Sequence, residues 1–128
     1  MGQPRSLFFF GNISMDIRVA VASSDGRTVN QHFGRAKRFR IYRITDDQSE
    51  FLEERVNSPA CSGQQHDDEL LERTADLISD CKAVVAAQIG GGAIDVLLYR
   101  RIRAFPLTGP IDEAITTLRA SKRFLYLT

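Results

Sequence analysis

The sequence predicts an α/β fold in which one mixed β-sheet carries helices on its faces. Three observations support this prediction. Short runs rich in β-branched residues alternate with turn-forming residues in the first half, helical periodicity begins only after residue 66, and helical and strand-like segments alternate from there to residue 120. The predicted order of elements is β-β-β-α-β-α-β-α.

Three strands are expected in the first half of the chain. Residues 17–22 (IRVAVA) form a short apolar run that leads into Ser-Ser-Asp-Gly, as expected for a buried strand followed by a turn. Residues 38–44 (RFRIYRI) alternate apolar side chains with arginine, which predicts a strand with one solvated face. After a turn at residues 46–48, residues 51–56 form the third predicted strand, and the three strands are expected to make an antiparallel meander.

Helices and strands alternate in the second half. A helix is predicted from Asp67 to about Asp80, because acidic residues open it and apolar side chains follow at helical spacing. The apolar run at residues 83–87 (AVVAA) is typical of a central parallel strand. The remaining predicted elements are a helix at residues 93–100 with Ile94, Leu97 and Leu98 facing inward, a strand at residues 102–105 and a helix at residues 111–120.

Length and composition predict one globular domain. The chain has 128 residues, of which 43% are hydrophobic and 26% charged. A formal net charge of +1 supplies no general attraction for nucleic acid or an anionic membrane, and no segment resembles a signal peptide or a membrane span. We therefore expect a cytoplasmic protein without nucleic-acid or membrane partners. Regular patterning starts near Asp16, so residues 1–14 are expected to be a disordered arm, a tag or a mis-assigned start, and residues 15–128 a single domain.

The turn Asn30-Gln31-His32-Phe33-Gly34 is the most informative feature of the sequence, and we interpret it as a ligand-binding site. His32 lies between two predicted strands where the backbone turns sharply, so its side chain is free to project. An imidazole in such a position can bind a metal, donate a hydrogen bond to an anion or transfer a proton. A ring that only hydrogen-bonds its own turn explains the residue equally well.

Gly90, Gly91 and Gly92 separate a predicted buried strand from a helix. Their N–H groups would be open to an anion at the positive end of that helix, although neither a dinucleotide fingerprint nor a P-loop lysine is present. A tight turn with positive φ is the equally good alternative.

Cys61, in a polar loop, could supply a thiolate to a soft metal or an iron–sulfur cluster, whereas Cys81 is expected to pack as a small apolar residue.

Carboxylates are plentiful but are not obviously paired. Asp25 and the acidic residues 67–69 would form a divalent-ion site only if the fold brought them together, and a solvated turn and a helix N-terminus explain them without a metal. His66, next to the acidic run, is expected to flank the helix on the surface. The sequence has no Gly-x-Ser-x-Gly or His-Glu-x-x-His motif, so catalysis is not indicated.

Several segments, taken together, carry a family resemblance. They are residues 19–26 (VAVASSDG), 29–36 (VNQHFGRA), 60–63 (ACSG), 80–84 (DCKAV) and 88–90 (QIG). In these segments the chain resembles the dinitrogenase iron-molybdenum cofactor biosynthesis family, which includes NifX, the core of NafY and the C-terminal domain of NifB. The resemblance covers about residues 16–120. It implies a ribonuclease-H-like α/β fold and a protein of nitrogen fixation that binds iron-molybdenum cofactor, or its iron–sulfur cluster precursor, and carries it during nitrogenase maturation.

The resemblance also implies which residues bind the cargo. His32 matches the cofactor-binding histidine of the family. The full predicted cofactor-binding set is His32, Asn30, Phe33, Gly34, Cys61, Gly90, Gly91 and Gly92, with His32 and Cys61 as metal ligands. The implied partners are nitrogenase maturation proteins or apo-dinitrogenase.

The implied role is that of a carrier and not of an enzyme. The radical-enzyme domain of NifB is not among these residues, so the chain is not expected to build the cluster. Two alternatives stay open: a regulatory or interaction domain of the same fold without cofactor, and a divalent-metal phosphoesterase suggested by the fold type alone.

Overall fold

A five-stranded mixed sheet with strand order β4-β3-β1-β5-β6 forms the centre of the molecule. Its strands are β1 (Asp16–Ala22), β3 (Arg38–Thr45), β4 (Ser49–Val56), β5 (Ala83–Ala86) and β6 (Arg103–Pro106). Strand β3 is antiparallel to both β1 and β4, whereas β1, β5 and β6 are parallel to one another. The structure is a computed structural model and describes residues 14–57 and 67–121.

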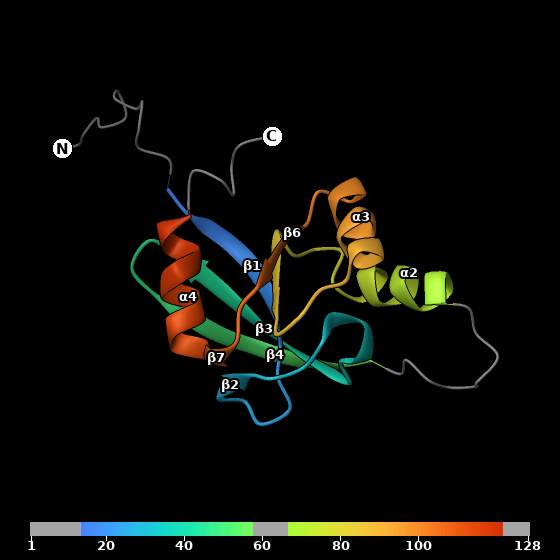
Figure 1. Cartoon of the computed structure of the whole chain (residues 1–128). Coiled ribbons are helices and arrows are strands. Elements are labelled where there is room, and N and C mark those ends of the chain that lie inside the picture. Colours follow the sequence, from blue (N-terminus) through green and yellow to red (C-terminus); the bar gives the residue numbers. More distant parts are fainter. Residues whose placement is uncertain (1–13, 58–66, 122–128) are drawn as a thin grey trace.

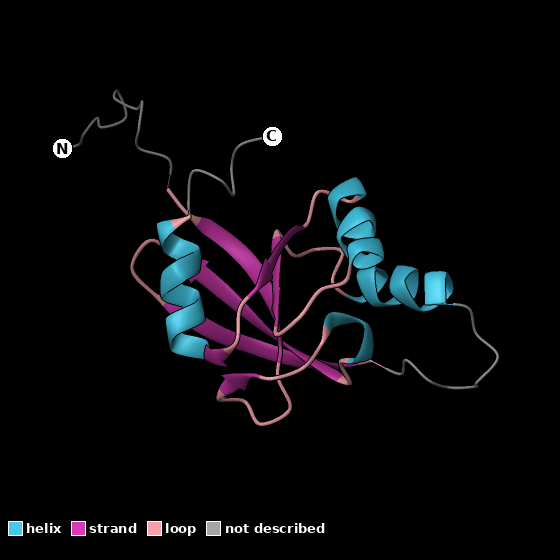
Figure 2. Cartoon of the chain, viewed as in Figure 1, coloured by secondary structure: helices cyan, strands magenta, loops and turns pink. Residues whose placement is uncertain are grey.

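Helices cover both faces of this sheet, as Figures 1 and 2 show. Helices α2 (Asp67–Leu77) and α3 (Gly91–Tyr99) pack on one face, and α4 (Ile111–Ala120) packs on the other. Successive side chains of β1 point to opposite faces, so Val19 and Val21 pack with Leu118 of α4 while Ala20 and Ala22 belong to the core under α2 and α3. The central strand is therefore buried on both sides.

The predicted mixed α/β architecture is confirmed. Strands β1, β3 and β4 form the expected antiparallel arrangement, and β5 is parallel to a strand on each side, as predicted for residues 83–87. The ribonuclease-H-like assignment stays a prediction. The expectation for residues 1–14 concerns a segment that, apart from Ser14, lies outside the described residues. Among the helices that the structure describes, none is long and apolar enough to cross a membrane.

Strand β3 does not have the single solvated face that the sequence suggested. Phe39 and Ile41 belong to the core under α2 and α3, whereas Tyr42 and Ile44 belong to the core under α4. The pattern was misleading because Arg40, on the Tyr42 side, is itself packed: its guanidinium carbon lies 3.9 Å from the centroid of a phenylalanine ring on β4. An arginine stem and a stacked guanidinium can cover apolar surface as a hydrophobic residue does.

Three short elements were not predicted. Strands β2 (Thr28–Val29) and β7 (Gly109–Pro110) form a separate two-stranded sheet, and η2 (Phe33–Arg35) is a single 3-10 turn. Elements of two or three residues are too short to display a hydrophobic period.

Leu98, expected to face inward, is 53% exposed. Helix α3 buries Ala93 and Leu97 instead, and the next position along a helix points about 100° away from the buried stripe.

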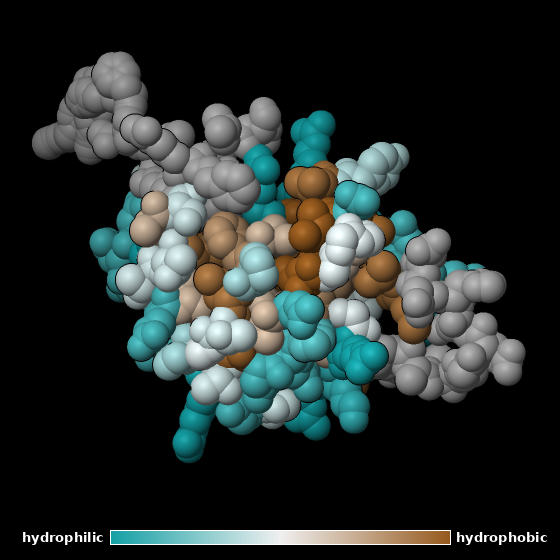
Figure 3. All heavy atoms as spheres, viewed as in Figure 1, coloured by the Kyte–Doolittle hydropathy of each residue, from teal (hydrophilic) through white to brown (hydrophobic). Residues whose placement is uncertain are grey.

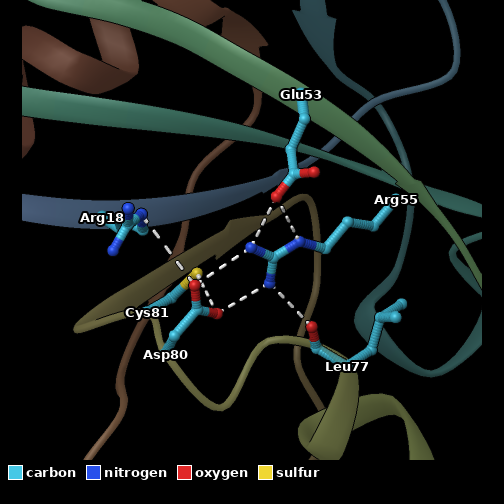
Figure 4. A network of polar contacts seen from close by, with 6 residues as sticks. All are labelled: Arg18, Glu53, Arg55, Leu77, Asp80 and Cys81. Carbon is cyan, nitrogen blue, oxygen red and sulfur yellow. Dashed lines mark hydrogen bonds and ion pairs between the residues drawn. The ribbon is translucent and has the colours of Figure 1, made fainter.

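An ion-pair network fastens β4 to the connection between α2 and β5 (Figure 4). The Arg55 guanidinium donates to both carboxylate oxygens of Asp80 at 2.7 and 3.0 Å and to the Leu77 carbonyl at 2.9 Å. Glu53 accepts two further hydrogen bonds from Arg55, at 2.8 and 3.0 Å. The Arg55 hydrogen bonds lower the pKa of the Asp80 carboxyl to about 2. One side chain of the edge strand thus holds the end of a helix.

Cys81 lies beside this network and is 4% exposed. Burial, and next the neighbouring Asp80 carboxylate, raise the pKa of the Cys81 thiol to about 12. The thiol is therefore neutral at physiological pH, and its predicted role as a small packed residue is confirmed.

Candidate functional site

Backbone hydrogen bonds hold the predicted histidine turn against the end of β5. His32 forms an isolated parallel bridge with Gln88. The Phe33 N–H donates to the Gln88 carbonyl at 2.9 Å, and the Ala87 N–H donates to the Gln31 carbonyl at 2.9 Å. The backbone of the turn is therefore fixed beyond the carboxyl end of β5, while the His32 side chain remains exposed.

Phe33 and Asn30 support this turn. Phe33 is fully buried, and its ring centroid lies 5.9 Å from that of Phe39. The Asn30 side chain accepts a hydrogen bond from the Ser24 N–H at 3.0 Å and donates one to the Ser24 hydroxyl at 2.9 Å. Both residues belong to the predicted binding set, but the structure places both in the support of the turn. Phe33 lies in the core, and the exposed Asn30 is engaged in hydrogen bonds with Ser24.

A pocket of about 350 Å³ opens beside His32. It lies where the histidine turn, helix α2 and the start of α3 meet. Its lining residues are His32, Gly34, Arg35, Leu70, Leu71, Gln88, Gly90, Gly92 and Ala93. An imidazole, a guanidinium and a carboxamide therefore share one opening with an apolar wall from α2. We call this opening the His32 pocket.

Helix α3 points its N-terminus at the His32 pocket. Gly90 is the N-cap of the helix, no side chain caps it, and the first turn contains no acidic residue. The first N–H groups of an α-helix have no partner within the helix and form the positive end of its dipole. The start of α3 is thus suited to an anion.

Internal packing does not explain the three glycines. The described glycines with positive φ are Gly26 and Gly109, so the segment 90–92 needs no left-handed conformation and the tight-turn explanation is excluded. A Cβ built on Gly91 meets no atom within 4 Å, and one on Gly92 would lie 3.6 Å from a methyl group of Leu71, an ordinary contact. Side chains would therefore fit at these positions in the protein as it stands.

Positive charge in the pocket comes from Arg35. This side chain is exposed, and no carboxylate of the described residues lies within ion-pair distance of it. In the described part of the chain, no three His, Cys, Asp or Glu side chains gather into a group that could enclose a metal ion. The pocket thus offers an anionic ligand one imidazole and one guanidinium.

The structure brings together four of the predicted residues, His32, Gly34, Gly90 and Gly92. Gly91 is exposed beside the pocket but does not line it. Cys61 and His66, and the side chains of Asp67 and Asp68, lie outside the described residues.

Asp25 has a structural role in its own loop. Its carboxylate accepts hydrogen bonds from the N–H groups of Arg27 at 2.8 Å and Thr28 at 2.9 Å and from the Ser23 and Thr28 hydroxyls at 3.2 Å. These bonds, first those from the two backbone N–H groups, hold the pKa of Asp25 far below its usual range. This carboxylate closes the β1–β2 loop and does not line the His32 pocket.

Sequence reasoning missed several pocket residues: Arg35, Leu70, Leu71, Gln88 and Ala93. Gln88 could have been found, since it directly follows a predicted parallel strand and ligands collect at the carboxyl ends of such strands. The leucines could not, because the sequence does not say where α2 lies relative to the histidine turn.

The chain is similar in sequence to proteins of one known family. The family model described as dinitrogenase iron-molybdenum cofactor matches residues 15–121. NifB of Frankia alni is 34% identical over 107 residues, which are 81% of this chain and 21% of that protein. NifX of Azotobacter vinelandii is 34% identical over 109 residues (84% of this chain, 68% of NifX), and NifY of Klebsiella pneumoniae is 36% identical over 108 residues (80% and 45%). The chain thus spans about a fifth of the length of that NifB relative.

Two solved structures share the fold. The crystal structure of PH0822 covers 81% of this chain and 91% of its own at a TM-score of 0.62 and 22% identity. A protein of Methanocaldococcus jannaschii covers 84% and 91% at a TM-score of 0.54 and 17% identity. At these identities the likeness concerns the fold alone.

Proposed function

The chain belongs to the dinitrogenase iron-molybdenum cofactor family, and we propose that it binds iron-molybdenum cofactor, or its iron–sulfur cluster precursor, and carries it during nitrogenase maturation. The observation that carries this proposal is the meeting of His32, Arg35 and the N-terminus of α3 at one pocket. The proposed recipients or donors are nitrogenase maturation proteins or apo-dinitrogenase. The proposed role is that of a carrier, not an enzyme.

The chemistry of the His32 pocket suits a cargo of this kind. Such clusters are anionic and rich in sulfide, so most of the coordination of their metals is already supplied. A neutral imidazole nitrogen from His32 can complete the coordination of one metal. The Arg35 guanidinium and the first N–H groups of α3 attract the negative charge, and the leucines of α2 offer an apolar wall.

A small number of protein ligands also allows the cargo to be released. A carrier must give up its cargo, and a site with one or two ligands holds the cluster less firmly than a closed cage of four cysteines. Cys61 remains the proposed second metal ligand. A Cys61→Ala variant tests that assignment.

The proposal is tested by anaerobic binding of isolated iron-molybdenum cofactor, followed by gel filtration and measurement of iron and molybdenum per chain. We expect the unmodified chain to co-elute with both metals, and His32→Ala to bind at least about tenfold more weakly because a direct ligand is lost. His66→Ala, which removes the other histidine of the chain, is the matched control and should bind normally.

Full binding by His32→Ala would show that the assignment of His32 is wrong. If the unmodified chain bound no metal at all, the carrier proposal would fail, and a regulatory domain without cofactor would be the better explanation.

A further inference from the structure

A second groove, of about 240 Å³, lies where α3 turns into β6. Three of its lining side chains are cationic: Lys82 directly before β5, Arg101 in the turn after α3 and Arg103 at the start of β6. Strands β5 and β6 are parallel neighbours, so their first residues bring Lys82 and Arg103 to the same end of the sheet. We call this opening the basic groove.

Arg101 occupies a position that normally favours glycine. Its φ is 63°, in the left-handed region. The Arg101 N–H donates to the Leu98 carbonyl at 2.9 Å and the Ile102 N–H to the Leu97 carbonyl at 2.8 Å, so α3 ends in a Schellman motif with arginine at its left-handed residue. Arginine is less stable there than glycine.

Apart from these two backbone hydrogen bonds, no ion pair with a described residue offsets this strain. The exposed Arg101 side chain has no carboxylate of a described residue within ion-pair distance. A strained residue whose side chain projects into a groove without an internal partner points to a use outside the molecule.

Apolar side chains lie next to the cations. Ile102 is buried in the groove, while Leu98 and Tyr99 are 53% and 89% exposed. Figure 3 shows hydrophobic residues gathered over β6 and the adjoining side of α3. Exposed apolar and aromatic side chains beside arginine are the usual composition of a protein-docking surface.

The charge around the groove limits what can occupy it. A second copy of the chain is disfavoured, because two basic grooves repel each other. Pro106 on β6 also lacks an N–H for strand pairing.

From these observations we infer that the basic groove docks an acidic segment of a partner protein, in which carboxylates flank an apolar side chain. A carboxylate pairs with Arg101, and the apolar side chain packs on Leu98. This inference does not rest on the proposed function. The groove and the His32 pocket share no lining residue, and they lie at opposite ends of α3.

The test uses the full chain labelled with nitrogen-15 and a short synthetic peptide in which two leucines are flanked by glutamates. In a low-salt titration, we expect backbone amide shifts to concentrate at residues 98–104 and at Lys82. Arg101→Glu should bind about tenfold more weakly because attraction becomes repulsion. Arg27→Glu, the same charge change at an exposed site on the β1–β2 loop, is the matched control and should bind normally.

Arg101→Gly removes the side chain without endangering the fold, because glycine suits the left-handed backbone better than arginine does. It should also weaken peptide binding while its melting temperature stays equal or rises. The inference is overturned if the amide shifts fall elsewhere or if both Arg101 variants bind like the unmodified chain. It is equally overturned if single-stranded DNA or polyglutamate without leucine binds as tightly at the same residues, since the groove would then be a general polyanion site.

Discussion

His32 combines a fixed backbone with a free side chain. The bridge to Gln88 sets the position of its Cα, and the buried Phe33 ring prevents the turn from lifting away. The histidine and its turn could be found in the sequence because they are local. Gln88 could not be placed beside it from the sequence alone, since the pairing that joins the turn to the end of β5 spans more than fifty residues.

Gly91 and Gly92 provide a matched pair of substitutions at the residue scale. Both lie in the first turn of α3 with room for a methyl group, but only Gly92 lines the His32 pocket. Each change to alanine should raise the free energy of unfolding by about 0.5 kcal/mol, because glycine is a poor helix former. Gly92→Ala should lower the affinity for iron-molybdenum cofactor by about tenfold, since its methyl group blocks close approach to the helix N–H groups.

Urea unfolding measures the stability of both variants, and anaerobic metal binding measures their affinity. Gly91→Ala should bind normally. Equal affinity of the two variants would mean that the cargo does not approach the start of α3.

At the scale of elements, the long strands and helices follow directly from their patterns. Residues 17–22 and 83–87 were predicted to be buried because they are apolar runs, and helices cover both faces of the sheet at β1 and β5. The prediction of a solvated face on strand β3 was wrong because it rested on solvent-facing arginines, whereas Arg40 packs on a neighbouring ring. Hydrophobic period alone does not distinguish a solvated arginine from a stacked one.

The contact between β4 and the end of α2 predicts a pH effect. The pKa of Asp80 is lowered from 3.8 to about 2, chiefly by its hydrogen bonds with Arg55. The ionised carboxylate therefore stabilises the fold above pH 4, and this contribution disappears as the pH falls from about 4 to about 2. Asp80→Asn should lower the free energy of unfolding by about 1 kcal/mol at pH 7. This value is reduced for solvent screening, because the pair is partly exposed.

The same variant should lose less stability than the unmodified chain between pH 4 and pH 2. Urea unfolding at several pH values measures both effects. Asp47→Asn, at an exposed turn, is the control and should change neither. Parallel pH profiles for Asp80→Asn and the unmodified chain would contradict the role given to this carboxylate.

At the scale of the whole molecule, α3 joins two separate openings. Its first turn faces the His32 pocket, and the residues after its last turn line the basic groove. The sequence predicted the helix and four residues of the His32 pocket, but not the basic groove, to which Lys82 is added only by the tertiary fold. A carrier with this arrangement can hold cargo and partner at the same time.

We therefore predict that the His32 pocket and the basic groove bind their ligands independently. His32→Ala should bind the acidic peptide like the unmodified chain, and Arg101→Glu should bind iron-molybdenum cofactor normally, because neither side chain lines the other opening. Peptide titration and anaerobic metal analysis of both variants provide the check. A loss of both activities in either variant would place the two ligands in one shared site.

We propose that His32 coordinates a metal of the cargo, and electron spin-echo envelope modulation can detect that bond. The chain is labelled with nitrogen-15 at histidine and loaded anaerobically with iron-molybdenum cofactor. We expect a histidine nitrogen coupling that changes with the isotope, persists in His66→Ala and is absent from His32→Ala at equal metal content. A coupling that survived in His32→Ala, or cargo bound to the unmodified chain without any histidine coupling, would contradict the claim.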